Sequence, residues 1–236
     1  MRPFLLFLFF LFFAAAHAQR VIDVGKTDVD PTRGFFYSVG GEPFSVAKYV
    51  KVVEGSPYFN ENWTRGSVIM PGGRRYDSLQ LKLDLLANEL HFLNIAGQEL
   101  VASSPVNEVI LIDTVSGIQF RFVHSSVIAV STPPDQGWYQ LLFEGSVSLF
   151  VLLHKEISEY RPYNSATTEQ TIKTTPRYFI VLNNSFTRIK KLSELADLLK
   201  DKSQEVKNYI DSNRLSGKSA ADYISVLSYY NSLLPK

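Results

Sequence analysis

Two short segments of the sequence carry the residue types that dominate tight binding sites. Each combines an aromatic side chain with arginine, and Trp, Tyr and Arg are enriched where a protein surface binds a partner strongly. The segments flank one short apolar run, residues 66–70, so we expect them to form loops at the two ends of a strand. The candidate binding residues are Trp63, Arg65, Arg74, Arg75 and Tyr76. The alternative, which is the commoner fate of isolated surface aromatics, is that Trp63 covers the core and the arginines are solvated.

The rest of the sequence contains no pattern of a catalytic or metal site. There is no cysteine, and His91, His124 and His154 stand singly in or at the end of predicted strands, where a structural role is the simpler interpretation. The HExxH, GxSxG, Walker A and GxGxxG patterns are absent. We therefore predict no catalytic residue, no metal ligand and no cofactor. Since a Ser/His/Asp triad is defined by geometry rather than by sequence order, an exported hydrolase with a dispersed site stays an alternative.

The first 18 residues have the three parts of a secretory signal peptide. Arg2 supplies the positive charge, Phe4 to Phe13 form an apolar run, and Ala16-His17-Ala18 is a small-x-small cleavage pattern. The apolar run is too short to span a bilayer, so we expect cleavage near Ala18 rather than a retained anchor. No later apolar run is long enough for a transmembrane helix. We expect export to the periplasm or the exterior of a bacterium, and a mature chain that is soluble.

The charges of the mature chain balance. Removing residues 1–18 removes one basic residue and no acidic one, which leaves 23 Lys and Arg against 23 Asp and Glu. A nucleic-acid binder shows a basic excess or a basic stripe, so this class of partner is excluded. An exported chain without cysteine has no disulfide framework, so its stability must come from its core.

The apolar pattern predicts an antiparallel β domain over residues 19–189. Short runs with strand periodicity recur roughly every eight to twelve residues. In the clearest run, Leu79, Leu81, Leu83 and Leu85 alternate with polar residues, so we expect one buried and one solvated face. The acidic residues between 84 and 113 are interpreted as part of that solvated surface. The polar stretch 159–176 predicts an exposed loop.

The most apolar stretch of the mature chain, residues 137–156, predicts a hairpin in the middle of the sheet. Its two runs carry apolar side chains on both faces, which requires cover on each side. We expect Leu141 and Leu149 in the core. Gly145, between the runs, is expected to supply the positive φ of a tight turn.

At Lys190 the apolar period changes to that of a helix. Apolar residues recur at helical spacing over 192–210 and again over 223–234, with a break at 213–218. Ser219 and Asp222 have the spacing of a capping box. We expect residues 190–236 to form a hairpin of two amphipathic helices packed on the β domain. The predicted fold class is α+β, a mainly antiparallel meander, curled sheet, barrel or sandwich followed by this helical hairpin.

Several segments, read in order, carry a resemblance to known sequences. They are residues 55–66, Tyr76, Leu81-Lys82-Leu83-Asp84 with the return Asn88-Glu89-Leu90, residues 139–145, and Tyr229-Tyr230-Asn231. This order resembles a family of uncharacterised exported proteins of Bacteroidetes-type bacteria. The resemblance implies a periplasmic or outer-surface address, and it transfers no activity and no site residue.

These patterns together predict an exported, non-catalytic, β-rich binding or scaffold module of the cell envelope. The expected partner is an envelope protein, a glycan or a lipid. One alternative is a closed barrel that carries a lipid or another small ligand inside it. The other is the dispersed hydrolase, which a cavity lined by Ser or Asp beside a His would favour.

Overall fold

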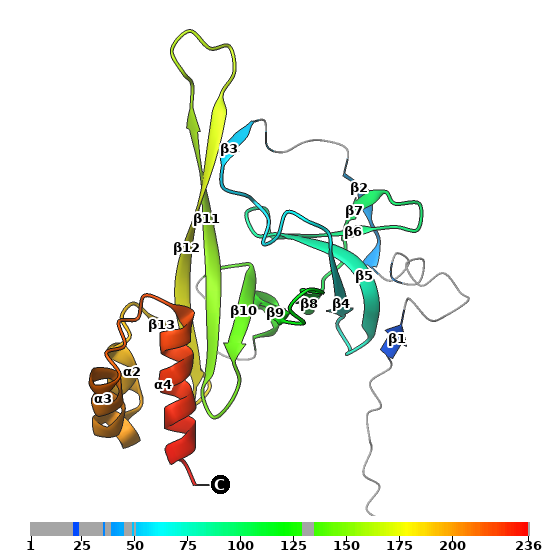
Figure 1. The fold of residues 1–236 in the computed structure, drawn as a ribbon. Helices are drawn as coiled ribbons and strands as arrows, with labels where there is room; N and C mark the ends of the chain where they lie inside the picture. Colours follow the sequence, from blue (N-terminus) through cyan, green and yellow to red (C-terminus); the bar gives the residue numbers. More distant parts are fainter. Residues whose placement is uncertain are drawn as a thin grey trace, which may run out of the picture.

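The structure is a computed structural model of the chain that describes residues 21–23, 35, 39–44, 49, 51–128 and 135–235. The expected signal peptide and its cleavage site lie outside the described residues. The described strands form one large, mainly antiparallel sheet, and helices follow at the C-terminal end (Figure 1). The predicted α+β fold class is confirmed.

The described residues form thirteen strands. Their bounds are β1 (Val21–Asp23), β2 (Glu42–Pro43), β3 (Val52–Glu54), β4 (Thr64–Ile69), β5 (Arg75–Asp84), β6 (Glu89–Leu93), β7 (Glu99–Val101), β8 (Glu108–Ile112), β9 (Gln119–His124), β10 (Trp138–Phe143), β11 (Ser148–Tyr160), β12 (Glu169–Leu182) and β13 (Ser185–Ile189). The order across the sheet is β13-β12-β11-β10-β9-β8-β4-β5-β6-β7-β2, while β1 pairs with β5 and β3 pairs with β12. The described strands at the two ends, β13 and β2, do not pair with each other, so the sheet is open, and the closed barrel is ruled out among the predicted architectures.

The alternating leucines of β5 form the core of the meander, as predicted. Leu81 and Leu83 are fully buried, and their cross-strand partners on β6, Phe92 and Leu90, are buried beside them. Side chains alternate between the two faces of a strand, so this register puts four apolar side chains on one face. The other face of the same hairpin is not fully solvated as predicted, because Asp84 and His91 are buried there.

The apolar hairpin β10–β11 lies in the middle of the sheet, between β9 and β12, as predicted. Leu149 packs on the face that the helices cover, and Phe150 packs on the opposite face with Tyr139. Gly145, however, does not have the expected positive φ. A Cβ at Gly145 would come within 2.7 Å of Asn231 Nδ2, so the glycine leaves room for the Asn231 side chain of α4 beside the turn.

The predicted loop over residues 159–176 is wrong. β11 and β12 pair without interruption from Ser148↔Val181 to Tyr160↔Glu169, which leaves only residues 161–168 as a connection. The sequence looked like a loop because both faces of this part are polar and exposed, apart from a few side chains such as Ile172. Pro176 pairs with Leu153 of β11 on one side, while on the other side neither β13 nor β3 pairs with β12 at that position. β12 is therefore an edge strand there, where proline is tolerated.

The C-terminal region contains more helices than the predicted two. They are α2 (Glu194–Leu198), a 3₁₀ turn (Lys200–Lys202), α3 (Ser203–Ser212) and α4 (Ala220–Leu233). The first predicted helix is interrupted at Leu199, where φ is −89° and ψ is 60°. The side chain of Leu199 is fully buried in the cluster that joins the helices to the sheet. The predicted cap of the last helix is confirmed, because the side chain of Ser219 accepts a hydrogen bond from the backbone N–H of Asp222.

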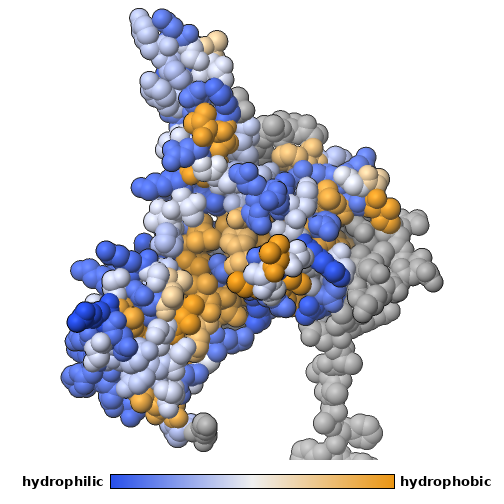
Figure 2. All heavy atoms as spheres, in the orientation of Figure 1, coloured by the Kyte–Doolittle hydropathy of each residue, from blue (hydrophilic) through white to orange (hydrophobic). Residues whose placement is uncertain are grey.

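The helices cover one face of the sheet at its β13 end. Val147, Leu149, Ile180 and Ile189 of the sheet region share one buried cluster with the apolar side chains of the helices. Figure 1 shows α4 against one half of the β10–β12 region, while β11 and β12 extend past the rest of the molecule at their other end. Figure 2 shows apolar side chains gathered over β10 and β11, and a mostly hydrophilic surface at the projecting end. None of the described helices is both long enough and apolar enough to cross a membrane.

The two-sided burial of the central hairpin predicts an order of stability losses. Leu149 is 0% exposed, so Leu149→Ala should lower the free energy of unfolding by about 2–5 kcal/mol. Leu141 is only half-buried, so Leu141→Ala should cost less, and Gln140→Ala should cost least. Midpoints of chemical denaturation measure this order. Equal midpoints for the three variants would contradict the assignment of the core face.

Candidate functional site

The five candidate residues divide between the two ends of β4. Trp63 and Arg65 lie at its start, where Arg65 pairs with Gln80 of β5. At the other end, Ile69 pairs with Arg75. The two sequence segments therefore lie at opposite ends of the strand and do not form one site.

The second segment belongs to β5 and to the core. Arg75 and Tyr76 are the first two residues of β5, so the expectation of a loop is wrong for both. Tyr76 is 1% exposed and packs edge-on against Phe35, with ring centroids 5.4 Å apart. The guanidinium of Arg75 donates to Asp77 Oδ1 at 2.7 Å, and that of Arg74 donates to Tyr76 Oη at 3.4 Å. Neither of the two described pockets is lined by any of the three predicted residues.

Trp63 and Arg65, in contrast, line a pocket of about 190 Å³, here called the Trp63 pocket. It lies where β4 begins, β8 ends and β9 begins. The side chains that give it its character are three aromatic rings, two amides, one guanidinium and one carboxylate. They are Phe59, Trp63, Phe120, Asn60, Asn62, Arg65 and Asp113. Trp63 and Arg65 were predicted from the sequence, and the other three residues of their segment were not assigned a role. Asp113 and Phe120 could not be found, because β8 and β9 meet this segment only in the folded sheet.

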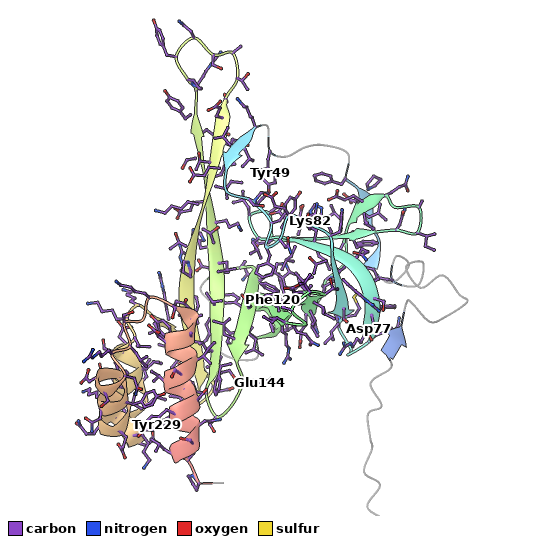
Figure 3. All side chains as sticks on the ribbon, viewed as in Figure 1. Tyr49, Asp77, Lys82, Phe120, Glu144 and Tyr229 are labelled. Atoms are coloured by element: carbon purple, nitrogen blue, oxygen red, sulfur yellow. The ribbon has the colours of Figure 1, made fainter. Side chains whose placement is uncertain are left out.

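Neighbouring contacts fix the walls of the Trp63 pocket. Lys82 Nζ lies 4.6 Å from the ring centroid of Trp63, and this cation–π contact fixes one face of the indole. Figure 3 labels Lys82 and Phe120. Phe59 packs edge-on against Phe120, with ring centroids 5.1 Å apart. Arg65 Nη2 donates to Ser78 Oγ at 2.8 Å. The aromatic and guanidinium groups are therefore positioned before any ligand arrives.

The pocket carries one charge of each sign. Asp113 Oδ2 accepts a hydrogen bond from Ser116 Oγ at 2.6 Å, and Oδ1 accepts from the backbone N–H of Val115 at 2.9 Å. The Ser116 hydrogen bond is the main reason why the pKa of Asp113 lies below its usual value, so this carboxylate is ionised at neutral pH. Together with Arg65, the pocket offers donors and acceptors without a net charge.

A second and larger pocket lies where β6 begins, β9 ends and β10 begins, and is here called the Trp138 pocket. Its volume is about 420 Å³, and its lining includes Glu89, His124, Ser126 and Trp138. The side chain of Trp138 is 4% exposed, and its Nε1 is buried without a hydrogen-bond partner among the described residues. The His124 ring stands edge-on to the indole, with centroids 5.1 Å apart. Sequence reasoning placed both residues in strands and gave no signal that they line a pocket.

His124 holds the start of a short 3₁₀ turn (Ser125–Val127) beside this pocket. Its Nδ1 accepts from the backbone N–H of Ser126 at 3.3 Å and lies 2.7 Å from Ser126 Oγ. Because Nδ1 accepts the backbone bond, the hydrogen-bond network assigns the proton of the neutral ring to Nε2. Burial lowers the pKa of His124, so the ring is neutral at pH 7.

The polar face of the β5–β6 hairpin is buried only in part. Gln80 is exposed as expected, but Asp84 is 1% exposed and accepts hydrogen bonds from Tyr49 Oη at 2.8 Å and from the backbone N–H groups of Leu86 and Ala87 at 2.9 and 2.7 Å. The expectation of a solvated surface is therefore wrong for Asp84. The reason is that Tyr49, from a distant segment, lies against it, which a β-strand pattern of period two does not reveal.

His91 lies in the same buried polar layer. It is 0% exposed, with Nδ1 2.7 Å from Glu99 Oε1 and Nε2 3.6 Å from Glu89 Oε2. The Tyr58 ring covers it edge-on at 5.8 Å, and burial, with nearby carboxylates, raises the pKa of Tyr58 to about 12. Among the described residues, no group of three or more His, Asp or Glu is placed to hold a metal ion. We interpret this layer as the support that fixes the segment leading into the Trp63 pocket.

The hydrogen bond between Tyr49 and Asp84 should contribute measurably to stability. Tyr49→Phe removes one donor from a buried carboxylate, which should cost about 1.5–3 kcal/mol, the range for hydrogen bonds to charged groups. Tyr163, which is 92% exposed, gives the matched control Tyr163→Phe. Denaturation midpoints of both variants measure the difference. If Tyr163→Phe lowers the midpoint as much as Tyr49→Phe, the loss does not come from the Tyr49–Asp84 hydrogen bond and the prediction is wrong.

The lowered pKa of His124 predicts a loss of stability in mild acid. The unfolded chain takes up the proton near pH 6.5, while the folded chain takes it up only at lower pH. The stabilisation is therefore complete above about pH 6.5 and is lost as the pH falls through the folded value. His124→Asn keeps a capping acceptor without titrating, so its midpoint should change less than that of the parent between pH 7.5 and 5.5. An equal change in both proteins would refute the assignment.

Comparison of the chain with protein-family models, with curated protein sequences and with solved structures found no match. The two pockets are therefore interpreted from their own geometry and chemistry.

Proposed function

We propose that the chain is a non-catalytic binding module of the bacterial cell envelope and that its Trp63 pocket binds one sugar residue of an envelope glycan. The observation that supports this most is the convergence of Phe59, Trp63 and Phe120 with two amides and a pair of opposite charges in one pocket. The signal peptide expected at the N-terminus supports the envelope address.

A sugar ring matches this combination of groups. It has apolar C–H faces that pack on aromatic rings, and hydroxyls at its edge that both donate and accept hydrogen bonds. Asn60 and Asn62 offer amide donors and acceptors, Arg65 offers only donors, and Asp113 offers only acceptors. A pocket with this mixture and no net charge favours a neutral polyhydroxyl ligand over an ion.

The size of the pocket limits how much of a ligand enters it. Sites for drug-sized molecules measure about 300–1,000 Å³, and the Trp63 pocket is smaller at about 190 Å³. One monosaccharide unit fits this space, with the rest of a glycan lying along the surface. A lipid chain is a poorer candidate, since the open sheet encloses no apolar interior and the pocket rim is polar.

The hydrolase alternative has one observation in its favour, the Ser126 hydroxyl 2.7 Å from His124 Nδ1 in the Trp138 pocket. The two residues are only two positions apart, and the same nitrogen accepts the backbone N–H of Ser126. This local cap explains the contact without catalysis. No carboxylate of the described residues is hydrogen-bonded to His124, so the third group of a triad does not support the alternative.

The test is binding of a panel of neutral mono- and disaccharides, measured by saturation-transfer NMR and by calorimetry. We expect saturable binding by the parent, and a loss of affinity of at least about tenfold for Trp63→Ala, as for removal of a hot-spot aromatic. Arg65→Ala should weaken binding as well. Arg74→Ala removes the same side chain at the other end of β4 and should bind like the parent.

Two results would contradict the proposal. One is the absence of binding to every sugar of the panel. The other is an equal loss in Arg65→Ala and Arg74→Ala, which would place the ligand outside the Trp63 pocket. Circular dichroism of each variant separates a lost contact from a lost fold.

A further inference from the structure

We infer that the Trp138 pocket is a second ligand site, built for a neutral molecule that carries an amide group. It shares no lining residue with the Trp63 pocket. Its volume, about 420 Å³, falls within the range of about 300–1,000 Å³ that is usual for small-molecule sites.

The pocket has one apolar wall and one polar wall. The apolar wall consists of Leu90, Ala102, Pro105 and Val106 together with the indole of Trp138. The polar wall includes Asn88, Glu89, His124 and Ser126. A ligand that fits both walls has an apolar substituent on one side and hydrogen-bonding groups on the other.

The indole N–H of Trp138 is a buried hydrogen-bond donor that has no acceptor among the described residues. Trp138 is more than nine-tenths buried and its Nε1 has no partner among them. A buried donor without an acceptor costs free energy, and native proteins leave few of them. The nitrogen is covered in this structure, so an acceptor reaches it only when the ring turns or its cover moves. Binding should therefore change the environment of the indole.

A second N–H donor belongs to the ring that packs against the indole. Because Nδ1 of His124 accepts from the backbone of Ser126, the Nε2 of the neutral ring is a donor. No hydrogen bond to this nitrogen is formed by the part of the chain that the structure describes. N–H donors on both rings of the lining favour a ligand with a carbonyl oxygen, which accepts hydrogen bonds.

The charge of the lining excludes an anion and explains the choice of an amide. Glu89 is the one charged side chain among the described lining residues, since burial keeps His124 neutral. A carboxylate or phosphate ligand would be repelled by Glu89. An ammonium group could donate to Glu89, but it has no lone pair with which to accept hydrogen bonds from the two N–H donors. An amide satisfies both, because its oxygen accepts and its own N–H can donate to the Glu89 carboxylate.

The two tryptophans of the chain make the test direct, since each lies in a different pocket. Trp63→Phe leaves Trp138 as the single indole, and Trp138→Phe leaves Trp63. The probes are N-acetyl-leucine amide, which is neutral, N-acetyl-leucine, which is an anion, and isopentylamine, which is a cation without a carbonyl group. Each is titrated into the full chain while tryptophan emission is recorded.

In Trp63→Phe we expect a saturable shift of the emission with the neutral probe, and an affinity at least about tenfold lower for the anion and for the cation. Glu89→Gln, made in the Trp63→Phe chain, should bring the affinity for the anion close to that for the neutral probe. In Trp138→Phe the neutral probe should leave the emission of Trp63 unchanged.

The inference is overturned if the neutral probe causes no saturable change in Trp138 emission, or if all three probes bind equally well. It is also overturned if the neutral probe changes the emission of Trp63 in Trp138→Phe with the same saturation curve. The glycan proposal is tested separately, by measuring sugar binding to Trp138→Phe. Failure of the amide site is therefore distinguishable from failure of the glycan site.

Discussion

Burial of both faces of the β10–β11 hairpin is the constraint on which the rest of the structure depends. A two-sided apolar hairpin is unstable in water unless each face is covered. On one face Leu149 is covered by the C-terminal helices, and on the other Phe150 packs with Tyr139 and Phe179. The hairpin also separates the meander, which carries both described pockets, from the helices. Trp138, the first residue of β10, belongs instead to the core of the meander and lines the Trp138 pocket.

The second organising feature is the buried polar layer of Asp84 and His91. Buried carboxylates are costly unless they are hydrogen-bonded, and Asp84 meets this requirement with three donors. Two of them are backbone N–H groups of the β5–β6 turn, and the third, Tyr49 Oη, comes from the segment that precedes the Trp63 pocket in the chain. A buried ionisable group thus anchors this segment without taking part in the pocket itself.

Periodicity in the sequence was enough to predict the antiparallel sheet, the central hairpin and the cap at Ser219, because these depend on neighbouring residues. It failed where a distant segment decides the environment. Asp84 of β5 looked solvated, yet it is buried and Tyr49 lies against it. The stretch 159–176 looked like a loop, since polar side chains on both faces leave no hydrophobic alternation to detect. Trp63 and Arg65 were found by composition alone, whereas Asp113, Phe120, His124 and Trp138 join their pockets only through sheet pairing.

The projecting part of β11 and β12 holds the connection 161–168 in a fixed position. A strand pair that is polar on both faces has little hydrophobic reason to keep one register. Here the register is set from both ends, by core residues such as Leu149 and by the hydrogen bond, 2.8 Å long, from the backbone N–H of Gln170 to the carbonyl of Lys51. Sliding the pair would break both sets of contacts at once. The connection 161–168 is therefore carried at a fixed distance from the two pockets, and a group attached there would be displayed on a rigid spacer rather than on a flexible tether.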